Sequence, residues 1–158
     1  MVFRHFGAPD ALDQARRLRQ ATHAAGVRLL IGLDADLALA VQADGVHLPE
    51  RALSAAYGLS GRNPDWILTG AAHSMKAVKR ARDLDALVLS PVFQAGGASA
   101  SRPALGLEGL ADLAAAAPCP TYALGGITVE NADSVKGVSG LAAVGSIVQA
   151  FGAPAIRT

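Results

Sequence analysis

The sequence has one cysteine, few aromatic residues and almost no net charge, and each shortage argues against a class of protein. A single cysteine, Cys119, permits no intramolecular disulfide and no thiolate metal cluster. The formal net charge of +1 argues against nucleic-acid or polybasic membrane partners, because both need concentrated positive charge. No apolar run reaches the ~18 residues of a membrane span, and the start of the chain is too polar for a signal peptide. We therefore expect a soluble, cytoplasmic protein.

Short apolar runs alternate with helical patterns along the chain, and 51% of its residues are hydrophobic. Seven runs predict strands: 2–6, 28–33, 45–48, 66–71, 86–93, 122–127 and 141–146. The patterns between them predict helices at 10–25, 34–43, 49–57, 74–83 and 107–117, with another starting at Thr128 and a short last helix from Val148 to Phe151. Gly26 and Gly58 are expected to end their helices.

This alternation at a period of roughly 20 residues needs helical crossovers, which gives an open doubly wound sheet or a (βα) barrel. The even period favours the barrel. A complete barrel has eight units and usually more than about 200 residues, whereas this chain has 158. We therefore predict an α/β fold, a TIM (βα) barrel incomplete at the N-terminus with about seven units, in which residues 1–158 form one domain.

The last two predicted strands each end in small residues, a pattern that indicates a phosphate site. Gly125 and Gly126 let the backbone approach a ligand or take a positive φ. TIM barrels commonly hold phosphate in the loops after their last two strands. We therefore predict phosphate contacts from Gly125, Gly126, Val144 and Gly145; an ordinary tight turn is the alternative.

Other polar residues have a functional and a structural interpretation. His47 and His73 lie near predicted strand ends. Each is expected to act as a general base or phosphate contact, or else to be a packed histidine. Ser101 and Arg102 form a lid over a ligand, or part of a solvated loop. We expect a solvated face for Lys76, Lys79, Arg80 and Arg82, surface positions for His5 and His23, and an inert Cys119.

Several stretches resemble the thiamine phosphate synthase/TenI family, in the family's order and spacing. They are Asp36-Leu-Ala38, Ala43 to Leu48, His73-Ser74, Pro91-Val-Phe93, Leu105-Gly106, Ala123 to Ile127, Glu130-Asn131 and Gly140 to Ile147. Arg4 matches the arginine of the family's Gln-x-Arg-x-Lys strand. The resemblance implies a TIM barrel whose first strand and helix are missing. An upstream start would add roughly 30 residues and complete the barrel; otherwise exposed strand edges favour a homo-oligomer.

Synthases of the family join a pyrimidine pyrophosphate to a thiazole phosphate and release pyrophosphate. Their chemistry uses Mg²⁺, held by carboxylates, to neutralise the leaving pyrophosphate, and a second subsite for the thiazole phosphate. The resemblance thus implies a transferase of thiamine biosynthesis. Its ligand would be a small phosphorylated compound, thiazole phosphate or thiamine phosphate, with Mg²⁺ as cofactor if synthase activity is retained.

The pyrophosphate half of the family site is largely replaced in this sequence. Apolar or small residues stand at the family's polar and metal-binding positions: Val2, Phe6, Gly32, Leu33, Ala52, Ala71, Ala95, Gly97 and Ala98. We assign no metal ligands, since Asp34 or Glu50 would reach a metal only from a shifted position. The TenI branch needs a catalytic histidine where this chain has Pro91, and proline cannot transfer a proton.

Three functions are compatible with these residues. The first is thiamine phosphate synthesis, with Arg4, His47 and His73 as candidate catalytic residues. The second is a non-catalytic, phospho-ligand-binding or regulatory TenI-like protein. The third is an isomerase or tautomerase acting on another small phosphorylated substrate, which would depend on His47 or His73.

Overall fold

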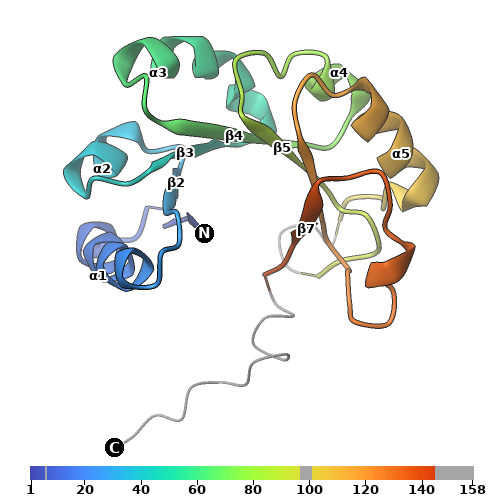
Figure 1. Ribbon diagram of the computed structural model, residues 1–158, viewed down its shortest axis with the longest axis horizontal. Coiled ribbons are helices and arrows are strands. Elements are labelled where there is room, and N and C mark those ends of the chain that lie inside the picture. The colour runs from blue at the N-terminus through green and yellow to red at the C-terminus, as the bar shows by residue number, and fades with distance from the viewer. Residues whose placement is uncertain (6, 97–100, 145–158) are drawn as a thin grey trace, which may run out of the picture.

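The computed structural model describes residues 1–5, 7–96 and 101–144, and one curled parallel sheet lies at its centre (Figure 1). Seven strands follow one another across the sheet in chain order, each parallel to the next. They are β1 (Val2–Phe3), β2 (Leu30–Gly32), β3 (Gly45–Leu48), β4 (Ile67–Ala72), β5 (Ala86–Leu89), β6 (Thr121–Leu124) and β7 (Gly140–Ala142). The predicted α/β barrel architecture of seven strands is confirmed. Within the described ranges, β1 and β7 do not pair with each other.

The α-helices of the described residues lie on the outer side of the curl in Figure 1. They are α1 (Ala11–Ala24), α2 (Ala35–Ala40), α3 (Ala56–Arg62), α4 (Met75–Val78) and α5 (Gly106–Ala116), with 3-10 turns η1 (Glu50–Ala55) and η3 (Ala132–Ser134). Side chains start two of them. Asp34 accepts a hydrogen bond from the N–H of Leu37 at the start of α2, and Ser74 accepts one from Ala77 at the start of α4.

Several predicted boundaries are wrong. The strands expected at 2–6 and 86–93 end at Phe3 and Leu89. Gly58 does not end a helix, because η1 passes into α3 at Ala56 and leaves the glycine inside a helix that runs to Arg62. Thr128 does not start a helix: Asn131 Oδ1 accepts a hydrogen bond from the Thr128 N–H and holds a turn instead. The helix expected at 74–83 is only one turn, α4. The expected last helix lies outside the described residues.

The two faces of the sheet differ in what covers them. Along β4, Leu68, Gly70 and Ala72 are buried, whereas the intervening residues are half-buried. The buried face packs on η1 and on the loop before β5, where a Cβ added to Gly70 would clash with Leu53 and lie 2.9 Å from Leu84 Cδ1. The core therefore fills the space between sheet and helices, and the concave face of the sheet remains for a ligand.

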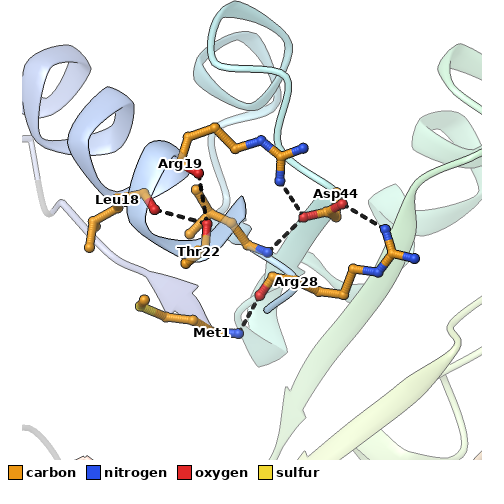
Figure 2. Close-up of polar contacts among 7 residues, drawn as sticks. Met1, Leu18, Arg19, Thr22, Arg28 and Asp44 are labelled. Carbon is orange, nitrogen blue, oxygen red and sulfur yellow. Dashed lines mark hydrogen bonds and ion pairs between the residues drawn. The ribbon is translucent and has the colours of Figure 1, made fainter. Parts of the chain in front are cut away.

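Two aspartates tie neighbouring strands together at the amino ends of the sheet. Asp44, just before β3, accepts a hydrogen bond from the N–H of Leu29 at 2.8 Å, and Arg19 and Arg28 donate to the same carboxylate (Figure 2). Asp85, just before β5, accepts a hydrogen bond from the N–H of Leu68 at 2.7 Å. Burial raises the pKa of Asp44, but the Leu29 N–H and the two guanidinium groups outweigh burial and lower it overall. These two contacts, which we call the aspartate clasps, secure β2 to β3 and β4 to β5.

Within the described residues, no helix has the length and apolar character needed to cross a membrane.

Candidate functional site

A cavity of about 1140 Å³ opens on the concave side of the sheet, at the carboxyl ends of its strands. Its floor consists of Gly32, His47, Ala71, Val88 and Leu124, one residue from each strand between β2 and β6. Carboxyl ends of parallel strands are the usual place for a ligand in α/β folds, because the loops that follow them converge there. The volume suits a small organic ligand.

The described residues that line this cavity give it an excess of positive charge. Five of them carry a positive side chain: Arg4, Arg51, Lys76, Arg80 and Arg102. Three are histidines, His5, His47 and His73, and only two are acidic, Asp34 and Glu50. A concave site with an excess of three positive charges attracts anions.

Strand register places the cavity residues Gly32 and His47 next to Thr69. Gly32 pairs with His47, which in turn pairs with Thr69, so the three residues form one row across β2, β3 and β4. His47 Nδ1 lies 2.9 Å from Thr69 Oγ1. A Cβ added to Gly32 would lie 2.9 Å from Arg4 Cγ, so the missing side chain leaves room for Arg4 beside this row.

His47 is a neutral hydrogen-bonding group at neutral pH. Burial, and to a smaller extent the positive charge of Arg4, lowers the pKa of His47 to about 4. The imidazole therefore carries no charge at pH 7 and does not pair with an anion as a cation. It can still donate or accept a hydrogen bond, or take up a proton transiently.

His73 is held in a single tautomer by its surroundings. Its Nδ1 lies 2.5 Å from the carbonyl oxygen of Ser90, which can only accept, so Nδ1 carries the proton. Its Nε2 lies 2.6 Å from Arg102 Nη1, which can only donate. The neutral ring thus fixes the guanidinium of Arg102 at the cavity.

The two carboxylates of the cavity are engaged within the protein. Glu50 accepts hydrogen bonds from the His73 N–H at 2.7 Å and from Ser74 Oγ at 3.0 Å, one on each oxygen. Asp34 Oδ1 accepts a hydrogen bond from the N–H of Leu37, and Asp34 Oδ2 lies 3.3 Å from His5 Nε2. All four carboxylate oxygens therefore have protein partners. Across the described ranges, no group of three or more His, Cys, Asp or Glu side chains is arranged to hold a metal ion.

The Gly125-Gly126 turn has a packing reason of its own. Both glycines have positive φ, +101° and +65°. A Cβ on Gly125 would lie 2.8 Å from Pro91, and one on Gly126 would lie 2.6 Å from the carbonyl oxygen of Gln94. The turn follows Leu124, which lines the cavity, but neither glycine is among the described lining residues. Phosphate binding by the pair stays a prediction.

The structure brings four sequence-predicted residues to one cavity: Arg4, His47, His73 and Arg102. Ser101, predicted to be part of a lid, is exposed and is not among the described residues that line the cavity. Val144 is 76% exposed beyond β7. Gly145 lies outside the described residues.

Sequence reasoning missed several cavity residues. Lys76 and Arg80, expected on a solvated face, are exposed but line the cavity, whereas Lys79 and Arg82 line a separate hollow. His5, expected at the surface, has a side chain only 16% exposed. The sequence did contain a signal for Lys76. A helix that directly follows β4 must place its first turn at the carboxyl edge of the sheet, and Lys76 lies in that turn of α4.

Comparisons with known proteins point to one family. Residues 3–147 match the family described as thiamine monophosphate synthase, TMP-TENI. A thiamine-phosphate synthase of Laribacter hongkongensis is 36% identical over 142 residues, which are 88% of this chain and 67% of that protein. One of Methanoculleus marisnigri is 32% identical over 143 residues, 88% of this chain and 68% of that protein.

A solved structure agrees with these relatives. Thiamine phosphate pyrophosphorylase from Pyrococcus furiosus superposes with a TM-score of 0.78 at 29% identity, over 93% of this chain and 72% of that one. The chain spans 63 to 70% of the length of four curated relatives, the two synthases above among them. With the matched residues covering almost its whole length, the chain belongs to the thiamine monophosphate synthase family.

Proposed function

We propose that this chain catalyses the coupling reaction of its family, joining hydroxymethylpyrimidine pyrophosphate to thiazole phosphate. In this reaction the thiazole nitrogen forms a bond to the pyrimidine methylene carbon. The bond from that carbon to the pyrophosphate oxygen breaks, and the electron pair leaves with pyrophosphate. The observation that carries the proposal is a cationic cavity at the carboxyl ends of the strands, in a chain whose residues 3–147 match the family.

The cationic residues suit the leaving group. Pyrophosphate gains negative charge as the carbon–oxygen bond breaks, so cations placed around it lower the barrier. Lys76, Arg80 and Arg102 line the cavity and can act in this way. We assign the thiazole phosphate to the turn at Gly125 and Gly126, where the main chain leaves β6.

His47 and Thr69 suit the uncharged part of a substrate. The two side chains share a hydrogen bond on the concave face, and the imidazole is neutral at pH 7. A neutral ring beside a developing pyrimidine cation avoids the repulsion that an imidazolium would cause. We therefore assign His47 to positioning the pyrimidine and not to holding phosphate.

A second candidate is a binder of the same ligands that does not catalyse their coupling. It is favoured by the engagement of Asp34 and Glu50 within the protein, since the family's chemistry uses carboxylate-held Mg²⁺. The two candidates predict the same ligands and differ in turnover.

The test is thiamine phosphate formation by the purified chain supplied with both substrates, with and without Mg²⁺. We expect turnover above ~10⁻³ s⁻¹, well below the usual range of about 1 to 10³ s⁻¹. No product, with thiazole phosphate still raising the melting temperature, would support the binder instead. If neither product nor stabilisation is seen, both candidates fail.

A further inference from the structure

The cavity presents several positively charged side chains to any ligand that enters it. Family chemistry implies Mg²⁺ between the protein and the pyrophosphate, and such an ion needs carboxylate or other oxygen ligands. We propose that this chain holds the phosphate groups of its ligand directly, through Arg51, Lys76, Arg80 and Arg102, without a divalent cation. The inference rests on the proposed function, because it concerns the ligand of the same cavity.

The carboxylates of the cavity do not fit Mg²⁺. Glu50 is held by the His73 N–H and by Ser74 Oγ, at the point where β4 passes into α4. Asp34 starts α2 and contacts His5. A metal would have to compete with these partners, and it would enter a cavity where the described cations already outnumber the acidic groups by three.

The cations are placed where an anion can reach them. Lys76 and Arg80 are four residues apart, both exposed, and both line the cavity. Arg51 joins them from the start of η1, just after β3, and Arg102 is fixed by its contact of 2.6 Å with His73 Nε2. Exposed cations lose little hydration before they meet a ligand, so their attraction for phosphate is not offset by a burial cost.

The number of cations indicates the ligand class. Four positive side chains in one cavity exceed the charge of a single phosphate monoester and match a diphosphate group, which carries three to four negative charges when fully ionised. Arginine binds such oxygens in a bidentate manner, and lysine acts as a point charge. Inorganic pyrophosphate is therefore the simplest probe of the site.

The experiment is calorimetric titration of the full chain with inorganic pyrophosphate, in EDTA and then in excess Mg²⁺. We expect binding in EDTA that Mg²⁺ does not tighten, because Mg²⁺ complexes the free anion. Lys76→Gln and Arg80→Gln should each weaken this binding about three- to tenfold, as expected for the loss of one charge-assisted contact. The matched controls Lys79→Gln and Arg82→Gln remove exposed charges outside the cavity and should change binding less than about twofold.

The outcomes separate this inference from the proposed function. Binding that requires Mg²⁺ overturns metal-free recognition and leaves the proposed function intact. Equal losses in Lys76→Gln and Lys79→Gln overturn the assignment of these side chains. No pyrophosphate binding in either buffer overturns the inference, and stabilisation by thiazole phosphate then shows whether the proposed function survives.

Discussion

Acidification from pH 7.5 to 5.0 is expected to destabilise the protein through His47. The folded state lowers the pKa of His47 to about 4, against an ordinary value of 6.5. Between these two values the unfolded chain binds a proton that the folded chain does not, so stability rises with pH. The contribution of His47 to the free energy of unfolding is complete above about pH 6.5, is lost as the pH falls toward 4, and does not change further below that pH.

The size of this effect follows from the two pKa values. Linkage gives a loss of about 2 kcal/mol in the free energy of unfolding between pH 7.5 and 5.0, and of about 3 kcal/mol once the folded state is also protonated. Other groups also titrate over this range. The quantity to measure is therefore the difference between the wild type and His47→Gln, which cannot titrate at this position.

Urea unfolding followed by fluorescence measures this difference. Trp66 is the only tryptophan and is 7% exposed, so its emission reports on unfolding. We expect the wild type to lose about 2 kcal/mol more than His47→Gln between the two pH values. His23→Gln, at an exposed helix position outside the cavity, is the control for replacing a histidine with glutamine. Parallel pH profiles for the wild type and His47→Gln would refute the argument, since His47 would then titrate equally in both states.

Three further perturbations test other parts of the structure. Asp44→Ala leaves the N–H of Leu29, just before β2, and two guanidinium groups without their acceptor, so we expect the free energy of unfolding in urea to fall by about 3 kcal/mol. Gly126→Ala places a Cβ 2.6 Å from the carbonyl oxygen of Gln94 at a φ of +65°, and we expect a melting temperature at least about 5 °C lower, which calorimetry would detect. Burial raises the pKa of the Cys119 thiol, so a disulfide reagent at pH 7.5 should modify it more slowly in the folded protein than in urea.

The sheet was predictable from the sequence because its signals are local. Each strand is a short apolar run bounded by small or polar residues, and the strand at 45–48 was predicted to the residue. Helix ends were less predictable, since they depend on contacts between distant residues. Ser74 does start α4, as its sequence indicates, yet the helix ends at Val78 with no local signal at that residue.

The site was predictable only in part, for a similar reason. His47 and Arg4 could be placed at a common edge because parallel strands share their carboxyl ends. That His47 lies between Gly32 and Thr69, with Arg4 beside them, depends on strand register. The alternation of apolar and polar residues along a strand does not determine this register. The exposed Lys76 lines the cavity because α4 follows β4 directly, and the lysine itself carries no signal of that position.

The aspartate clasps have a consequence for how this chain can evolve. They secure neighbouring strands at the amino ends of the sheet, whereas ligand chemistry takes place at the carboxyl ends. Side chains on the floor of the cavity can therefore be exchanged, even from acidic to apolar, while the strands stay bound to their neighbours. A protein built in this way can change its ligand specificity through substitutions in the cavity while its sheet stays folded at every step.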